Sequence, residues 1–324
     1  MIFEQKYRDV IGLISREHRN ERPYFFILDY YKERGYFLNS EQLDNEILKF
    51  DFSGTAIKGF SGSSLALSFT PLEYSVFENA FNRVYDHILS GDSYLLNLCF
   101  KSKIHLNLSL NQIFQMARAK YKVFLHDQFV AFSPETFVII EKEKIHTFPM
   151  KGTRIAESEA DKELLLNDPK ENAEHYTIVD LLRNDLSIVA NEVRVEQFKY
   201  LDLIQTDRHS LWQMSSHISG KIREHFKENI GELLDQLLPA GSVTGAPKKR
   251  TCEIITEAEN FNRKYYTGIC GYFDGRKLET AVLIRFIELD NGEFYFKSGG
   301  GITSMSASKS EYLEVINKIY VPVF

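Results

Sequence analysis

Cysteine and proline are scarce in this 324-residue chain, and long hydrophobic runs are absent. The three cysteines, Cys99, Cys252 and Cys270, lie far apart, which excludes a disulfide framework or a CxxC zinc site and indicates a reducing compartment. No apolar stretch approaches the roughly 20 residues that span a bilayer. The amino terminus is charged from Glu4 onward and lacks the apolar core of a secretory signal. We therefore expect a cytoplasmic protein without membrane association.

An excess of positive charge is also absent. Lys and Arg total 39 residues against 45 Asp and Glu, so the formal net charge is −6. Nucleic-acid-binding domains usually carry a basic excess, and this composition argues against such a partner. An anionic ligand would have to be held locally, by a few basic side chains, by backbone N–H groups or by a metal ion.

The chain has the composition of an ordinary folded protein, with 44% hydrophobic and 26% charged residues. Apolar residues recur every three or four positions, which predicts helices over 78–89, 110–121, 171–188, 230–238, 248–259 and 309–319. Alternating or continuous apolar runs predict strands over 103–108, 129–132, 137–140 and 294–296. Strands and helices follow no regular alternation and no linker divides the chain. We therefore predict an α+β fold with large, mainly antiparallel sheets, in one domain over 1–324.

Two pairs of glutamates have helical spacing. Glu171 and Glu174 open one predicted helix, and Glu311 and Glu314 lie in the last one. Residues three apart project from the same face of a helix. If the two faces met, their carboxylates could hold Mg²⁺, which prefers oxygen ligands completed by water and an anionic substrate. Taken singly, each pair is better explained as a solvated helix face.

Two segments of small residues are candidates for anion binding. The segment 239–247 reads Pro-Ala-Gly-Ser-Val-Thr-Gly-Ala-Pro and precedes Lys248 at a predicted helix start. Gly299, Gly300 and Gly301 follow a predicted strand. Small residues let backbone N–H groups approach a ligand closely, although a tight connection would use the same residues.

Lys151 lies at the end of a predicted strand, in the sequence Phe-Pro-Met-Lys-Gly-Thr. A lysine acts as a nucleophile when burial or a neighbouring cation lowers its pKa, and it can also bind an anion. An isolated lysine is nearly always a surface charge. The residues alone leave these alternatives open.

Taken in order, these segments resemble those of the chorismate-utilising enzymes, the family of anthranilate, aminodeoxychorismate, isochorismate and salicylate synthases. The resemblance runs from about Ser133 to Lys318. Its motifs are Lys-Gly-Thr at 151–153, Glu-His at 174–175, Ile-Val-Asp-Leu-Leu-Arg-Asn-Asp-Leu at 178–186, the small residues of 241–248, Tyr-Thr-Gly at 266–268, Gly-Tyr-Phe at 271–273, Ile-Arg at 284–285, Gly-Gly-Gly-Ile at 299–302, and Glu311, Glu314, Asn317 and Lys318. It implies a central β sandwich flanked by helices, with Mg²⁺ bridging the ring carboxylate of chorismate to glutamates on two helices.

The resemblance also implies roles for individual residues. Glu174 and Glu314 correspond to the metal ligands, and Glu171 and Glu311 to companions that bind metal-bound water or transfer protons. Substrate contacts are implied for Ser242, Tyr266, Arg285, Gly299, Gly300, Gly301 and Lys318. The tyrosine and the arginine of this set would contact the enolpyruvyl carboxylate. Without the family context they are better explained as a core tyrosine and an ordinary ion-paired arginine.

Two positions bear on which reaction the resemblance implies. Lys151 precedes Gly-Thr as in aminodeoxychorismate synthases of one type, whereas anthranilate synthases usually have alanine there. The strand position of the general-base lysine in isochorismate and salicylate synthases is Leu95 here, and a hydrocarbon cannot activate water. We therefore expect Lys151 to attack C2 of chorismate, with its pKa lowered by Mg²⁺ and burial, and ammonia to replace the C4 hydroxyl in the 4-aminobenzoate and folate route. Anthranilate formation and a chorismate-binding protein without catalysis remain alternatives.

Gln213 stands where the family often has histidine. Glutamine donates and accepts hydrogen bonds but cannot carry an imidazolium charge. The chain shows neither a glutaminase nucleophile motif nor a lyase module, so the resemblance implies ammonia from a separate glutamine amidotransferase subunit. The short segment before Ser133 argues against a tryptophan-binding regulatory pocket.

Overall fold

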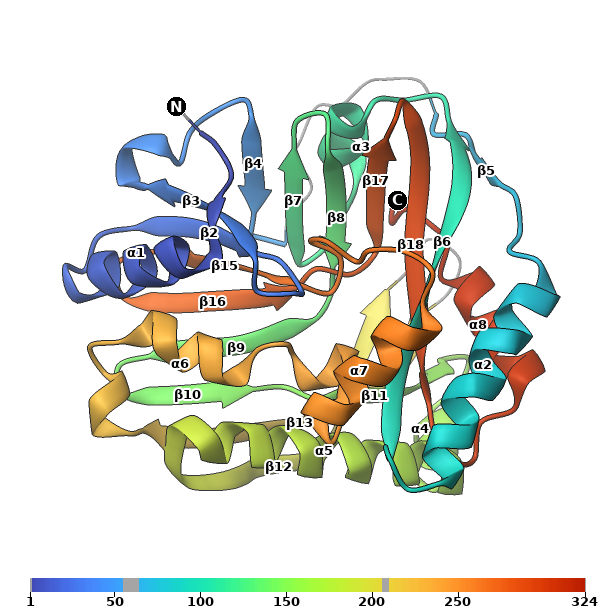
Figure 1. Cartoon of the computed structure of the whole chain (residues 1–324). Coiled ribbons are helices and arrows are strands. Elements are labelled where there is room, and N and C mark those ends of the chain that lie inside the picture. The colour runs from blue at the N-terminus through green and yellow to red at the C-terminus, as the bar shows by residue number, and fades with distance from the viewer. Residues whose placement is uncertain (1, 55–63, 206–209, 324) are drawn as a thin grey trace.

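The computed structural model describes residues 2–54, 64–205 and 210–323. Two large sheets, whose strand pairs are antiparallel in the described residues, form the centre of the molecule (Figure 1). Ten strands form sheet A, in the order β1 (Gln5–Lys6), β3 (Arg34–Asn39), β2 (Tyr24–Leu28), β15 (Ile269–Phe273), β16 (Lys277–Val282), β9 (Thr136–Glu141), β10 (Lys144–Thr147), β13 (Ser210–Ile222) and β11 (Met150–Ile155), with β12 (Ala190–Gln205) also paired to β13.

Eight strands form sheet B, in the order β14 (Gly245–Ala246), β6 (Leu95–Leu106), β18 (Glu293–Ile302), β17 (Phe286–Asp290), β8 (Phe129–Ser133), β7 (Tyr121–Leu125) and β4 (Leu48–Asp51), with β5 (Leu67–Phe69) also paired to β6. The inner faces of the two sheets share one hydrophobic core. Phe25 and Ile27 from sheet A pack there with Val123, Ala131 and Phe286 from sheet B. The predicted α+β sandwich is confirmed.

Helices cover the outer faces of both sheets (Figure 1). They are α1 (Tyr7–Arg19), α2 (Tyr74–Leu89), α3 (Leu110–Met116), α4 (Ala160–Leu166), α5 (Pro169–Val189), α6 (Ile230–Leu237), α7 (Lys248–Ala258) and α8 (Ser308–Asn317). Apolar residues of α1, α5 and α6 form a core with sheet A, while α2 and α7 pack against β6 of sheet B. Within the described ranges, no helix is both long and apolar enough to cross a membrane.

The beginning of α5 places the first glutamate pair. Asp168 caps this helix, since its carboxylate accepts hydrogen bonds from the amides of Lys170 and Glu171 at 2.9 and 3.0 Å. Pro169 occupies the first turn, where its missing N–H costs no hydrogen bond. Helix α5, which carries Glu171 and Glu174, packs against β11 and β13 of sheet A, and α8, which carries Glu311 and Glu314, packs against β18 of sheet B.

Four details of the prediction are wrong. The helix predicted over 110–121 ends at Met116, because Tyr121 already begins the fully buried strand β7. Lys151 lies near the start of β11, not at the end of a strand, and the three glycines at 299–301 lie inside β18. Helix α1 was missed, although Val10, Ile11 and Ile14 have helical spacing and are buried.

Candidate active site

A cavity of about 510 Å³ opens between the two sheets and helices α5 and α8. Eleven of the twelve predicted site residues line it, namely Lys151, Glu171, Glu174, Ser242, Tyr266, Arg285, Gly299, Gly301, Glu311, Glu314 and Lys318. Gly300 does not line the cavity, but a Cβ atom built there would lie 3.5 Å from Glu314 Oε1. Segments separated by more than 160 positions in the sequence therefore meet in one place.

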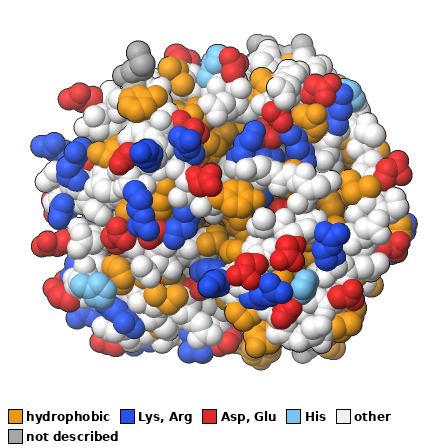
Figure 2. All heavy atoms as spheres, in the orientation of Figure 1, with side chains coloured by type: hydrophobic (Ala, Val, Ile, Leu, Met, Phe, Trp, Pro, Cys, Tyr) orange, Lys and Arg blue, Asp and Glu red, His pale blue; other side chains and the backbone are white. Residues whose placement is uncertain are grey.

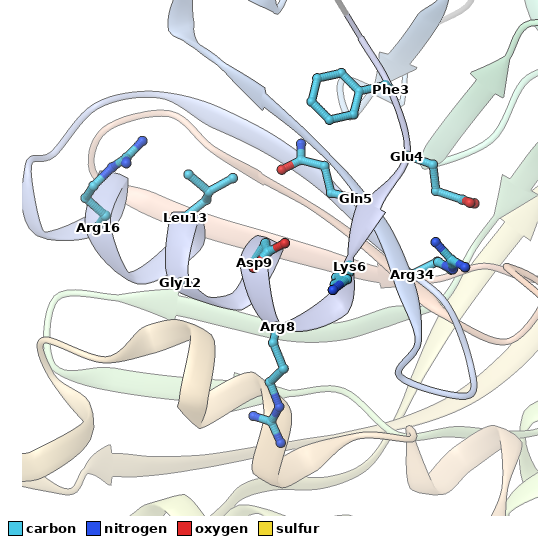
Figure 3. Close-up of a pocket in the computed structure, with 10 residues that line it drawn as sticks. All are labelled: Phe3, Glu4, Gln5, Lys6, Arg8, Asp9, Gly12, Leu13, Arg16 and Arg34. Atoms are coloured by element: carbon cyan, nitrogen blue, oxygen red, sulfur yellow. The ribbon is translucent and has the colours of Figure 1, made fainter.

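A larger hollow of about 740 Å³ lies at the surface beside α1, β1 and β3 (Figure 3). It contains none of the predicted site residues. Its charged side chains, such as Lys6, Asp9 and Arg34, are exposed to solvent. Acidic and basic side chains are also interspersed on the face shown in Figure 2, without a continuous basic area. We assign the active site to the enclosed cavity, because only a partly enclosed site strengthens electrostatic interactions with a small ligand.

Two lysine–glutamate pairs face the cavity. Lys151 Nζ lies 2.8 Å from Glu174 Oε2, and Lys170 approaches the other oxygen of Glu174 at 3.8 Å. On the opposite wall, Lys318 Nζ lies 2.6 Å from Glu314 Oε1 and donates to the carbonyl of Gly299 at 2.8 Å. Each predicted metal ligand thus forms an ion pair with a lysine.

The pKa values of Glu171, Glu311 and Glu314 are shifted, and not all in the same direction. Burial raises the pKa of Glu171, and the neighbouring charge of Glu174 adds to the effect. Burial also raises the pKa of Glu311, although Ser306 opposes it by hydrogen bonding. Burial acts in the same direction on Glu314, but the Lys318 ammonium outweighs it and the pKa of Glu314 is lowered. Glu314 therefore suits a metal ligand, and Glu171 and Glu311 suit proton transfer.

The pKa of Lys151 is set by opposing effects. Burial acts to lower it, but the carboxylate of Glu174, followed by those of Glu314 and Glu171, outweighs burial and raises the pKa. The lowered pKa expected from the sequence depended on a bound Mg²⁺ beside these carboxylates and stays a prediction. Across the cavity, burial dominates and lowers the pKa of Lys318.

The donor chemistry around the cavity fits Mg²⁺. Four carboxylates from two helices face it, and oxygens of Glu314 and Glu311 converge to 3.5 and 3.7 Å from the Cβ position of Gly300. Within the described ranges, no three His, Cys, Asp or Glu side chains form a ready metal-binding group. Mg²⁺ does not require one, because it commonly takes one or two protein carboxylates and completes its shell with water and an anionic substrate.

Glu135 is a site residue that the sequence analysis missed. It lines the cavity, and the Ser242 hydroxyl donates a short hydrogen bond to its carboxylate. Burial raises the pKa of Glu135, opposed by Ser242 and by the charges of Lys318, Arg285 and Lys151. A carboxyl group that stays protonated can donate a proton to a leaving hydroxyl. Its place in Ser-Pro-Glu, where the family resemblance begins, was the available signal.

Tyr266 and Arg285, the two predicted contacts of the enolpyruvyl carboxylate, differ in how accessible their polar groups are to a substrate. Tyr266 is almost fully buried, and burial raises the pKa of its hydroxyl, which stays protonated and able to donate a hydrogen bond. Arg285 lies with its guanidinium 4.9 Å from the centre of the Tyr320 ring and has no ion-pair partner in the part of the chain that the structure describes. It is free to bind an anion.

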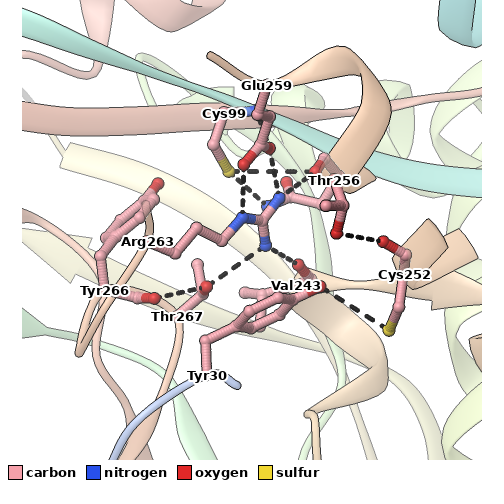
Figure 4. Close-up of polar contacts among 10 residues, drawn as sticks. Tyr30, Cys99, Val243, Cys252, Thr256, Glu259, Arg263, Tyr266 and Thr267 are labelled. Atoms are coloured by element: carbon pink, nitrogen blue, oxygen red, sulfur yellow. Dashed lines mark hydrogen bonds and ion pairs between the residues drawn. The ribbon is translucent and has the colours of Figure 1, made fainter. Parts of the chain in front are cut away.

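A buried arginine, Arg263, makes polar contacts with several surrounding residues (Figure 4). Arg263 is fully buried, forms an ion pair with Glu259, and donates to the carbonyls of Val243 at 3.0 Å and Asn97 at 2.7 Å. Val243 and Asn97 themselves line the cavity. No sequence pattern indicated this network, because Asn97 is separated from Arg263 by 166 positions.

The remaining sequence candidates are also located. Leu95 lines the cavity, and Gln213 lines it while donating to the carbonyl of Gly152 at 2.9 Å. Lys248 does not line the cavity. Its ammonium donates to the Leu237 carbonyl and pairs with Asp185. The lysine at the start of α7 therefore fastens this helix to α5 and α6.

Comparison with known proteins decides the family. The family model described as chorismate binding enzyme matches residues 41–323. The chain belongs to the chorismate-binding enzymes. A protein of Haemophilus influenzae named an uncharacterized PabA-like protein is 46% identical to this chorismate-binding enzyme over 308 residues, or 94% of each chain.

Relatives with a named activity are more distant. The aminodeoxychorismate synthase component 1 of Escherichia coli is 33% identical over 74% of this chain, and the anthranilate synthase component 1 of Pseudomonas putida is 34% identical over 75%. The matched parts span 55% and 51% of those two proteins. The crystal structure of anthranilate synthase component I from Streptococcus pneumoniae superimposes with a TM-score of 0.72 at 23% identity, over 92% of this chorismate-binding enzyme and 80% of that chain. This likeness establishes the shared fold.

Proposed function

We propose that this chorismate-utilising enzyme is an aminodeoxychorismate synthase component I, which converts chorismate and ammonia to 4-amino-4-deoxychorismate and water. The observation that carries the proposal is Lys151, whose ammonium enters the cavity beside Glu174. Leu95 supports the proposal by arguing against the addition of water. It lines the cavity at the position of the general-base lysine of isochorismate and salicylate synthases, and its hydrocarbon side chain cannot activate water. Relatives from Escherichia coli and Bacillus subtilis that bear this name add support at 33% and 31% identity.

The proposed reaction has two displacements at the substrate ring. Lys151 Nζ forms a bond to C2 as the two conjugated ring double bonds shift towards C4 and the C4–O bond breaks, and the hydroxyl leaves as water. Ammonia then forms a bond to C4, both double bonds return to their original positions, and the C2–N bond to Lys151 breaks. A covalent intermediate of this kind replaces one difficult substitution by two easier ones.

The side chains of the cavity can handle the protons that these steps require. Glu135, with a raised pKa, is suited to protonate the leaving hydroxyl. Lys151 must first lose the proton that Glu174 stabilises at 2.8 Å. Mg²⁺ held by Glu174 and Glu314 would bind the ring carboxylate and polarise the conjugated ring. Once Glu174 is engaged elsewhere, burial favours the neutral amine of Lys151.

The assay is turnover of chorismate by the purified chain with ammonium and Mg²⁺, with the product identified by mass spectrometry and fluorescence. We expect 4-amino-4-deoxychorismate, which retains the enolpyruvyl group. Fluorescent anthranilate with release of pyruvate would instead identify an anthranilate synthase component I, the second candidate among the named relatives. Tight chorismate binding without turnover would identify a non-catalytic binding protein and overturn the proposal.

We also propose that ammonia reaches this chain from a separate glutamine amidotransferase subunit. The three cysteines offer no glutaminase nucleophile in the described structure: Cys99 and Cys270 are buried, and burial raises the pKa of Cys252. Co-purification of a glutaminase that confers glutamine-dependent turnover would support this arrangement. Glutamine-dependent turnover by the chain alone would refute it.

A further inference from the structure

Strand β11 is irregular at the residue that the proposed reaction uses. Its Met150 pairs with Ser215 of β13, and its Thr153 pairs with Gln213. Three steps along β11 therefore match two steps along β13, so that Lys151 and Gly152 stand together opposite a single residue. This is a β-bulge, which bends a strand and redirects a side chain at the cost of regular ladder hydrogen bonds.

The carbonyl of Lys151 is held by a buried histidine. His175 Nδ1 lies 3.1 Å from this oxygen, and Nε2 lies 2.7 Å from Ser216 Oγ. Because a carbonyl can only accept, Nδ1 carries the proton, and Nε2 accepts from the Ser216 hydroxyl. Ser216 Oγ accepts in turn from the amide of Lys199 at 3.0 Å. His175 is fully buried, so a lost partner in this chain could not be replaced by bulk water.

The carbonyl of Gly152 is held by a second side chain. Gln213 Nε2 donates to it at 2.9 Å. Gly152 has a φ of +96°, and a Cβ atom there would lie 2.9 Å from Met214 Cε and 3.2 Å from Glu171 Oε2. Only glycine fits this position without strain. Both carbonyls of the bulge are thus bound by side chains from neighbouring elements.

We propose that His175 and Gln213 are positioning residues that hold the bulge so that the Lys151 ammonium points into the cavity. His175 follows Glu174 on α5, so it links the bulge to the helix that carries a predicted metal ligand. Position 213 then needs a hydrogen-bond donor and not a titrating group, and glutamine meets that need where the family often has histidine. The inference rests on the proposed role of Lys151.

The test measures the orientation of Lys151 in the absence of substrate and metal. Lysines are labelled briefly with acetic anhydride, and peptide mass spectrometry gives the ratio of labelling at Lys151 to that at Lys318. Lys318 is a matched internal control, because it lines the same cavity and its side chain is 29% exposed against 32% for Lys151. The variants are Gln213→Met, which keeps a similar length without a charge and loses the donor, and His175→Leu.

In Gln213→Met and His175→Leu we expect this ratio to change by about threefold or more, with kcat lower by about 10- to 100-fold and KM for chorismate nearly constant. Gln213→His and His175→Asn retain a donor and should stay close to the parent in both measurements. If His175→Leu does not fold, Gln213→Met alone tests the proposal. An unchanged labelling ratio and kcat in folded Gln213→Met would overturn the proposal. Failure of the proposed function is a separate result, which would show as anthranilate formation by the parent or as an active Lys151→Ala variant.

Discussion

Lys151 and Glu174 form an ion pair of 2.8 Å between strand β11 and helix α5, at the wall of the active-site cavity. One member is the proposed nucleophile and the other a proposed metal ligand. While the Glu174 carboxylate is free to pair with Lys151, it favours the protonated ammonium. If Glu174 binds another cation, burial favours the neutral amine of Lys151. If Glu174 holds Mg²⁺ as proposed, metal binding would also withdraw the carboxylate that keeps Lys151 protonated.

The first prediction concerns the metal. Glu174→Gln and Glu314→Gln keep the side-chain size but remove charge from the proposed Mg²⁺ site, and we expect each to lower kcat/KM by about 10²- to 10³-fold. The measurement is turnover as a function of Mg²⁺ concentration. Glu163→Gln, on the exposed face of α4, is the matched control and should behave like the parent. Full activity of both cavity variants, or of the parent in excess chelator, would refute the metal assignment.

The second prediction concerns the nitrogen source. The purified chain should use ammonium salts better as the pH rises, because free ammonia is the nucleophile, and it should not use glutamine. Tryptophan should not inhibit it. Initial rates with ammonium chloride or glutamine, each with and without tryptophan, check both statements. Strong inhibition by tryptophan would be evidence for the regulatory site that the sequence argued against.

The third prediction concerns stability at acidic pH. Burial lowers the pKa of His18 from 6.5 to about 4, while its ring packs 4.3 Å from that of Phe273. Between these values the unfolded chain binds more protons than the folded one, so the free energy of unfolding falls as the pH falls through this window. Burial lowers the pKa of His175 and His217 in the same direction.

Melting temperatures at pH 7.5 and pH 5 check this prediction. His18→Gln removes one titrating group, so the loss of melting temperature on acidification should be smaller than in the parent. His126→Gln is the control, because the His126 side chain is 59% exposed. An equal loss in the His18 variant and the parent would contradict the assignment.

The fourth prediction concerns the buried ion pair of Arg263 and Glu259. Arg263 and Glu259 are exposed by 0% and 2% in their side chains, so removal of one partner leaves a buried charge. Arg263→Met should lower the free energy of unfolding by about 3–5 kcal/mol. The double variant Arg263→Met/Glu259→Leu should recover part of that loss. Denaturant unfolding measures both, and a loss below about 1 kcal/mol for the single variant would contradict this role.

Much of the site was predictable because its motifs lie in short segments with recognisable spacing. Glu171 with Glu174 and Glu311 with Glu314 each form one face of a helix, and the resemblance to the chorismate-utilising enzymes implied that the two faces meet. The bond between Ser242 and Glu135 was not predictable, because 107 residues separate the two. The raised pKa of Lys151 was not predictable either, since it depends on the three-dimensional arrangement of three glutamates.

Product formation by Lys151→Ala tests the central claim most directly. The substitution removes the proposed nucleophile and leaves the glutamates of α5 and α8 and the Arg285 contact in place, so chorismate should still bind. With chorismate, ammonium and Mg²⁺, mass spectrometry should show that the variant has lost most 4-amino-4-deoxychorismate formation, with any remaining amination at C2. Formation of 4-amino-4-deoxychorismate at the rate of the parent would contradict the account, because Lys151 would then be an anion contact and not the nucleophile.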